Sequence, residues 1–140
     1  MYREEFYYKA EYISIKNCRE HIKSLSLKYN FYNIFIENIE ISIGELFTNI
    51  IKHGQKGLAE ENDIKINIFI DETRFEITFE YFGDIPTEDR ISEVNKVKEI
   101  EHVEELSESG RGIYIINKLM DKLYFEKNGN VAKAVLIKFL

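Results

Sequence analysis

The residues of this chain best suited to chemistry lie close together in the stretch GELFTNIIKHG, at positions 44–54. Glu45, Asn49, Lys52 and His53 recur there at helical spacing, which places them on one side of a helix that advances about 100° per residue. A carboxylate and an amide one turn apart can hold a hydrated magnesium ion, and the carboxylate can also accept a proton from an attacking hydroxyl. The spacing therefore favours Mg-nucleotide chemistry, although it also suits the solvated flank of an ordinary helix.

A second candidate is the short stretch SGRG, which consists of Ser109, Gly110, Arg111 and Gly112. Glycines in front of a helix let backbone N–H groups approach an anion, and the helix N-terminus adds a favourable partial charge. Apolar residues at helical spacing follow these glycines, so we expect a turn here that opens a helix. Such a turn can bind phosphate, or it can be a hinge or a tight entry turn that binds no ligand.

Hydrophobic periodicity predicts the helices that must position these residues. Apolar steps of three and four predict one helix over about residues 14–29 and a second, long helix that Asn30 can cap and Gly54 ends. The polar line described above borders the apolar stripe of that second helix. Residues 84–109 contain the only proline, many acidic residues and little periodicity, so we expect a lid there rather than a core element.

Alternating and aromatic runs predict the strands. An aromatic run predicts a first strand over about residues 4–10, and strict alternation predicts strands over 64–70 and 75–81 that pair as an antiparallel hairpin. The Asn-Gly pair within LYFEKNGNVAKAVLIKFL predicts a closing hairpin. The order β, α, α, β, β, lid, α, β, β favours an α+β sandwich, with a mixed, mostly antiparallel sheet and helices packed on one face. No linker divides residues 1–140, so we expect a single domain.

Composition limits the class of protein. A content of 44% hydrophobic and 31% charged residues is typical of a globular domain. The net charge of −6 includes no basic block, which argues against direct nucleic-acid binding, and no apolar run is long enough for a membrane span or a signal segment. A single cysteine, Cys18, lies on the inward stripe of the first helix and favours the reducing cytoplasm. His21 and His102 lack the spacing of a metal site or catalytic pair.

Taken together, these motifs resemble a known family. An E-x-x-x-N-x-x-K-H-G helix, a strand pair that ends in a glycine turn at Gly83, a variable lid and a G-x-G helix before a closing hairpin are similar to the GHKL ATPase superfamily. The single-domain chain with ELFTNIIKHG and SGRGIYIINKLMD most resembles the anti-sigma-factor serine/threonine kinases of bacterial partner-switching systems. The resemblance covers nearly the whole chain in order, and it implies a Bergerat-type α/β sandwich, in agreement with the element order reached from periodicity.

The resemblance also implies roles for the motif residues. Asn49 would coordinate Mg²⁺ through its side-chain oxygen, and Glu45 would be the general base for the attacking hydroxyl. Lys52 and His53 would lie near the phosphates of ATP, and the turn at 109–112 would hold these phosphates through backbone amides. The implied cofactors are therefore ATP and Mg²⁺.

The chain departs from the family pattern at Tyr81. In the family, the strand before the first glycine box usually ends in Asp-x-Gly, whose aspartate hydrogen-bonds the exocyclic amine of adenine, but here EYFGDIP places Tyr81 two residues before Gly83. Glu80 and Asp84 are neighbours, but a one-residue displacement sends a strand side chain to the opposite face, so neither substitutes simply. Tyr81 can stack on a base, hydrogen-bond through its hydroxyl or fill the pocket, and the sequence leaves these alternatives open.

The resemblance implies an ATP-dependent serine/threonine kinase that binds and inhibits a sigma factor and phosphorylates an antagonist of the STAS-domain type. One alternative is a non-catalytic protein-binding module in which Tyr81 closes the adenine site, and another is the ATP-binding half of a histidine-kinase-like sensor. Protein partners are expected, rather than nucleic acid or a membrane. Related regulators commonly form dimers through the sheet region, and the aromatic N-terminal strand is a candidate edge for a homodimer.

Overall fold

The computed structural model describes residues 1–29, 33–54, 63–96 and 108–140. Its elements are β1 (Tyr2–Tyr8), α1 (Tyr12–Lys28), α2 (Asn33–Asn49), the π-helical turn η1 (Ile50–Gly54), β2 (Ile64–Ile70), β3 (Arg74–Phe82), α3 (Glu88–Lys96), α4 (Glu108–Leu119), β4 (Lys122–Asn128) and β5 (Val131–Phe139). The predicted order of strands and helices is confirmed, with α3 inside the predicted lid. Among the described residues, none of the helices combines the length and the apolar composition that a membrane span requires.

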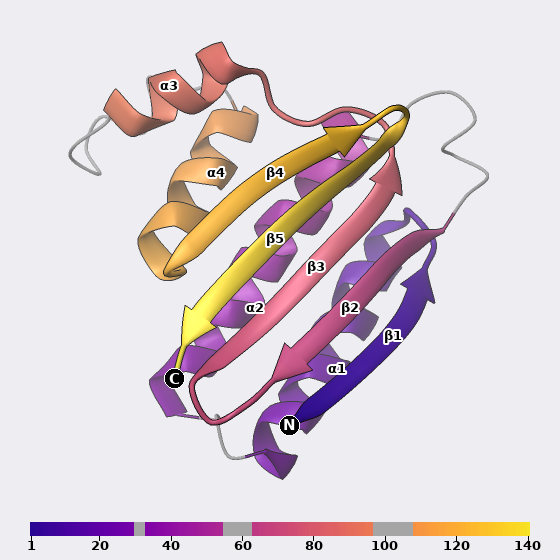
Figure 1. Ribbon diagram of the computed structural model, residues 1–140, viewed down its shortest axis with the longest axis vertical. Helices are drawn as coiled ribbons and strands as arrows, with labels where there is room; N and C mark the ends of the chain where they lie inside the picture. The colour runs from indigo at the N-terminus through magenta and orange to yellow at the C-terminus, as the bar shows by residue number, and fades with distance from the viewer. Residues whose placement is uncertain (30–32, 55–62, 97–107) are drawn as a thin grey trace.

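The strands form one open sheet in the order β1-β2-β3-β5-β4, and all four pairings are antiparallel. Helices α1, α2 and α4 lie behind one face of this sheet, while α3 lies beyond its end next to α4 (Figure 1). The predicted α+β sandwich with helices on one face is therefore confirmed. The described strands contain no parallel pair, whereas the sequence analysis expected a mixed sheet.

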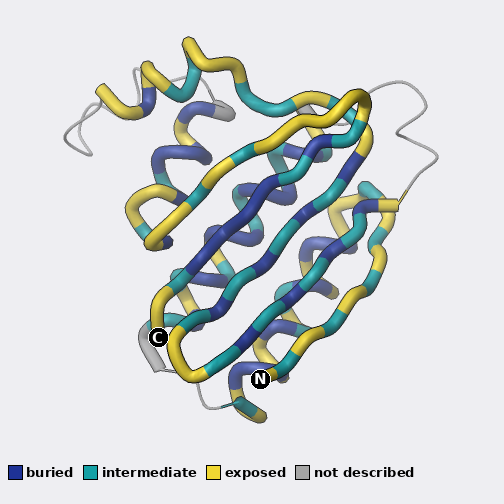
Figure 2. Tube along the Cα trace, viewed as in Figure 1, coloured by how far each residue is buried: buried dark blue, intermediate teal, exposed yellow. Residues whose placement is uncertain are grey.

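Alternation along the central strands sends every second side chain into the core. The buried residues of β2 and β3 are Ile64, Ile66, Ile68, Ile70, Phe75, Ile77, Phe79 and Tyr81. Figure 2 shows the resulting alternation of buried and half-buried positions along both strands. The turn between them is closed by Asp71 Oδ1, which accepts hydrogen bonds from the N–H groups of Thr73 and Arg74 at 2.8 and 2.9 Å. This hairpin is the central pair of the predicted sheet.

Helix α2 supplies the centre of the core on the helix side. Its buried apolar residues are Ile36, Ile39, Ile43, Leu46 and Phe47, followed by Ile50 in η1. The ring of Phe47 lies 5.7 Å from that of Phe79 on β3, edge to face, and 6.4 Å from that of Tyr8 on β1. These contacts fix how α2 is rotated about its own axis. Burial raises the pKa of the Cys18 thiol to about 12, and this residue is the small core side chain that was predicted.

Several predicted boundaries were wrong by a few residues. The first strand is Tyr2–Tyr8 rather than 4–10, because aromatic side chains on both of its faces obscure where the alternation begins. The long second helix is α-helical only to Asn49 and continues as the π-helical turn η1. Asn30, the predicted cap, lies outside the described residues, as do residues 97–107 of the predicted lid, including His102.

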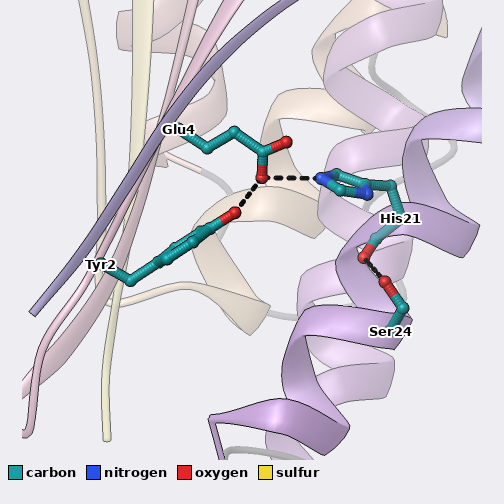
Figure 3. Close-up of polar contacts among 4 residues, drawn as sticks. All are labelled: Tyr2, Glu4, His21 and Ser24. Carbon is teal, nitrogen blue, oxygen red and sulfur yellow. Dashed lines mark hydrogen bonds and ion pairs between the residues drawn. The ribbon is translucent and has the colours of Figure 1, made fainter.

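A polar cluster ties the edge strand β1 to α1 (Figure 3). The carboxylate of Glu4 accepts a hydrogen bond from the hydroxyl of Tyr2 and lies 2.9 Å from Nε2 of His21. Burial pushes the pKa of the Glu4 carboxyl upward, but its hydrogen bonds to Tyr2 and His21 together outweigh this and hold the pKa below its usual range. The ring of Phe6 packs edge-on against His21 at 5.0 Å. His21 therefore has a structural role.

We expect Glu4→Gln to lower the free energy of unfolding by about 1 kcal/mol at pH 7. Because the folded pKa of Glu4 lies below its unfolded value, the charged carboxylate stabilises the protein above the unfolded pKa, and this contribution is lost as the pH falls through the folded pKa. Urea unfolding of the wild type and the variant at pH 7 and at about pH 3 measures the difference in their free energies of unfolding. This difference should be smaller at the lower pH.

The matched control is Glu5→Gln, since Glu5 lies on the opposite face of β1 and pairs with Lys65 at 2.9 Å in a half-exposed position. This control should change stability by less than about 0.5 kcal/mol at either pH. If the Glu4 variant differs from the wild type in free energy of unfolding by the same amount at both pH values, the assigned charge interaction is contradicted.

Candidate functional site

The polar flank of α2 faces α4. Glu45 and Asn49 lie one turn apart beside the buried stripe, and both are partly exposed. They meet α4 at Gly112, where an added Cβ would lie 3.1 Å from Oε2 of Glu45 and 3.2 Å from Nδ2 of Asn49. Three residues singled out from the sequence are thus in direct contact.

The glycines of SGRG lie inside a helix rather than in a turn. Residues Ser109, Gly110, Arg111 and Gly112 all belong to α4, so the turn predicted in front of this helix is wrong. Gly112 has no Cβ, which lets α4 pack closely against Glu45 and Asn49, and this packing outweighs the poor helix propensity of glycine, about 1 kcal/mol. In a helix only the first turn has N–H groups without helical acceptors, so an anion would meet α4 ahead of Gly112.

The side-chain amide of Asn49 is incompletely satisfied. Its Nδ2 atom is buried and has no hydrogen-bond partner among the described residues. Leaving a buried polar atom unpaired costs roughly 1–3 kcal/mol, so such an atom in a folded protein needs an explanation. The oxygen and nitrogen of an asparagine amide exchange places on rotation, and either atom at this position would be satisfied by a bound ligand.

A cleft of about 640 Å³ opens beside Asn49, where η1, the end of β3, residues 84–90 and β4 meet. This volume lies within the range of small-molecule sites. Apolar side chains line part of it, namely Leu46, Ile50, Ile85 and Phe125. The cleft can therefore accommodate a flat, largely apolar group such as a nucleobase.

Basic side chains from three elements line the same cleft, namely Lys52, His53, Arg90 and Lys127. Lys52 and His53 are exposed on η1, so the predicted pair reaches the cleft although this segment is π-helical rather than α-helical. The acidic lining residues are Asp84 and Glu88, and Asp84 pairs with Lys127 at 2.5 Å. In a chain with a net charge of −6, this local excess of basic groups would attract an anionic ligand.

Tyr81 occupies the helix-facing side of β3 at the wall of the cleft. Its side chain is only 3% exposed, and its hydroxyl donates a hydrogen bond to the main-chain carbonyl of Asp84 at 2.9 Å. Burial, aided by the charge of Asp84, raises the pKa of Tyr81 well above its usual range, so the phenol stays neutral. The cleft remains open beside it. The N–H of Gly83 bonds to the carbonyl of Asn130 at 3.0 Å, which ties the end of β3 to the β4–β5 turn.

Sequence reasoning missed Arg90, Phe125 and Lys127 as lining residues. The signal for Lys127 is strand register, because it lies opposite Ala132 on β5, which in turn lies opposite Tyr81 on β3. Residues directly opposite one another share a face of the sheet. Phe125 and Lys127 lie two residues apart on β4 and therefore share a face of the sheet. Once the order β3-β5-β4 is known, this face can be assigned to the cleft.

The sequence also matches a known protein family. Residues 9–136 match the histidine kinase-like ATPase domain. The chain belongs to the histidine kinase-like ATPase family. The predicted resemblance to GHKL ATPases is thereby confirmed.

Curated relatives of this family member are named serine-protein kinase RsbW. The Bacillus licheniformis protein is 27% identical over 133 residues, which cover 94% of this chain and 81% of the relative. The Bacillus pumilus protein is 26% identical over 134 residues, with the same coverage. The protein of Listeria monocytogenes serovar 1/2a is 29% identical over 135 residues, covering 94% and 82%. The similarity to these serine-protein kinases thus extends along nearly the whole chain.

We expect Gly44→Ala to stabilise the protein and Gly112→Ala to give no such gain. Replacing a helical glycine by alanine normally raises the free energy of unfolding by about 0.5–1 kcal/mol. At Gly44 the new Cβ would meet only the Arg19 side chain, at an ordinary 3.5 Å, so the full gain is expected. At Gly112 the contacts of 3.1 and 3.2 Å force Glu45 or Asn49 to move, which removes the gain.

Urea unfolding of the two variants beside the wild type measures this difference. An equal stabilisation by both alanines would show that α4 does not press on the polar flank of α2.

Proposed function

We propose that this chain is an ATP-binding serine/threonine protein kinase that regulates transcription by partner switching. In this proposal it binds a sigma factor as an anti-sigma factor and phosphorylates an antagonist of the STAS-domain type. One observation supports it above the others: Glu45 and Asn49 meet Gly112 at the edge of an open cleft with basic walls. The family membership implies ATP use, and the name of the relatives supports transfer to serine.

The residues of the site fit a nucleotide with its metal ion. Among the described residues, no three His, Cys, Asp or Glu side chains gather into a metal site, so Mg²⁺ would need phosphate oxygens to complete its coordination, as is usual for Mg-nucleotides. Asn49 would hold it, and its partnerless buried amide fits that role. When bound, Mg²⁺ neutralises charge on the phosphate oxygens.

The protein side chains then have distinct roles. Lys52 and His53 would attract and orient the phosphates, together with the N–H groups of Ser109 and Gly110 at the start of α4 and the Arg111 side chain. Glu45 would accept the proton of the substrate hydroxyl while the oxygen of that hydroxyl bonds to the γ-phosphorus. The bond from that phosphorus to the bridging oxygen breaks, and ADP leaves. Residues 84–109 would act as the lid of a single domain over 1–140 and exclude water.

A second candidate is a non-catalytic protein-binding module. It is favoured by Tyr81, because its hydroxyl is already engaged by the Asp84 carbonyl and no carboxylate stands at this position to read the adenine amine. The open cleft beside Tyr81 supports the kinase instead. The oxygen of Tyr81 keeps acceptor capacity while its proton is donated, so it can still accept a hydrogen bond from a base.

The proposal extends to partners and compartment. The protein partners would be the sigma factor and the STAS-type protein, in the cytoplasm, which is compatible with the free thiol of Cys18. The edge position of β1 supports a homodimer contact through the sheet region. No direct contact with nucleic acid is proposed.

Millimolar Mg-ATP should raise the thermal unfolding temperature of the wild type, because a ligand of the folded state stabilises it by linkage. We expect Asn49→Ala to reduce this rise sharply, while Asn38→Ala, at a partly exposed position earlier in α2, keeps it. Differential scanning calorimetry with and without Mg-ATP measures the effect. No rise in the wild type would favour the non-catalytic module.

Glu45→Gln should slow phosphate transfer to a STAS-type protein by about 10²–10⁴-fold, the usual contribution of a general base. The same variant should retain the stabilisation by Mg-ATP, because Glu45 acts on the hydroxyl rather than on the nucleotide. Transfer of labelled phosphate from Mg-ATP to candidate antagonists provides the readout. Glu37→Gln, an exposed carboxylate on the same helix, is the control, and undiminished transfer by the Glu45 variant would reject the assigned base.

A further inference from the structure

A second cavity lies between α1 and α2, on the side of α2 away from the sheet, and also measures about 640 Å³. The two helices run side by side behind the sheet (Figure 1). None of the residues that line this groove lines the cleft beside Asn49. The described part of the molecule thus has two separate openings near the polar flank of α2.

Glu45 connects these openings. It lines the groove between α1 and α2 rather than the cleft, yet its Oε2 atom reaches Gly112 beside Asn49, which does line the cleft. In phosphoryl transfer the attacking and leaving oxygens lie roughly in line on opposite sides of the phosphorus. With a nucleotide in the cleft, a hydroxyl that donates its proton to Glu45 can approach from the groove, because Glu45 lines it.

Basic side chains predominate on the α1 wall of the groove. Lys16, Arg19 and Lys23 recur at steps of three and four along α1, and none of them forms an ion pair with another residue in the described ranges. The Arg19 guanidinium lies over Gly44, the residue before Glu45, where an added Cβ would be 3.5 Å from Nη1. Glu20 also lines the groove from α1, so this wall carries three basic groups and one acidic group, an excess of positive charge in a chain whose net charge is −6.

The opposite wall of the groove is formed by α2. On the α2 side, Glu40 and Glu45 line the groove, so a segment bound there meets mainly cations along α1, where Glu20 is the one carboxylate, and carboxylates along α2. Tyr12 and Ile41 also line it and are exposed, which offers apolar contact to a bound chain. A segment with acidic residues beside its hydroxyl places those acids on α1 and the hydroxyl toward Glu45.

We propose that the groove between α1 and α2 is the docking site for the substrate protein, and that it selects a serine- or threonine-bearing segment with acidic flanking residues. This proposal rests on the kinase function, because it names the substrate of the same Glu45. Lys16, Arg19 and Lys23 touch the flanking residues and not the reacting atoms, so they determine specificity rather than chemistry.

The test uses two variants of the full chain with equal loss of charge. The groove variant neutralises the α1 strip and is K16Q/R19Q/K23Q. The control variant neutralises lysines at the end of α4 and on β4 and β5 and is K118Q/K122Q/K133Q. The probes are two fluorescein-labelled peptides with one central serine, flanked by Asp and Glu in one and by Lys in the other.

Fluorescence anisotropy should show that the acidic peptide binds the wild type and the Lys-flanked peptide does not. Each exposed ion pair contributes a modest amount, so losing three should weaken the acidic peptide about tenfold in the groove variant. The control variant should stay within about twofold of the wild type. Added NaCl should weaken the wild-type complex, because salt screens exposed charge pairs.

With Mg-ATP and the acidic peptide as phosphate acceptor, the groove variant should raise KM about tenfold and leave kcat within about twofold, since it removes binding common to the ground and transition states. Failure of the acidic peptide to bind, or equal binding by both variants, overturns the docking site. Charge-dependent peptide binding without any stabilisation by Mg-ATP keeps the docking site and rejects the kinase. Stabilisation by Mg-ATP together with peptide binding that does not depend on the α1 strip keeps the nucleotide site and rejects the docking site.

Discussion

Helix α2 packs against the sheet with one face and presents polar residues to the candidate site with another. Its period of 3.6 residues per turn separates these two faces. One side carries the buried stripe that includes Ile43 and Phe47, and neighbouring sides present Gly44 to α1 and Asn49 to α4. Rotating the helix would expose several large apolar side chains, each worth about 1.5–3 kcal/mol when buried. The core therefore fixes the direction of every polar group on this helix.

The contact between α2 and α4 depends on a residue without a side chain. Gly112 brings α4 against Glu45 and Asn49, at distances where any Cβ would displace one of them. The arrangement also leaves the Asn49 amide nitrogen buried without a partner in the described part of the chain. Ser42 Oγ and Arg74 Nε are also buried without a partner among the described residues, but of the three atoms only that of Asn49 belongs to a residue that lines the cleft.

The parts of the fold that depend on local pattern were predictable. The strand over 64–70 matches β2 at both ends, because alternating isoleucines and the Asp71 turn act within a few residues. The helix start at Glu108 was not predictable, since polar residues and glycines disfavour a helix locally and only packing against α2 favours it. The contributions of Arg90 and Lys127 to the cleft were also missed, because they depend on where α3 lies and on strand order, which periodicity does not reveal.

The π-helical turn η1 gives the chain an unusual sensitivity to length. Such a turn accommodates one residue more than an α-helical turn and is often found at functional sites. Removing a single residue between Ile50 and Gly54 would restore the α-helical repeat and rotate everything after it by about 100°. Lys52 and His53 would then swing away from the cleft while the isoleucines of α2 stayed in place. A one-residue gap here would thus displace this lysine and histidine in a relative that keeps every motif letter, so the number of residues in this turn has to be compared along with residue identity.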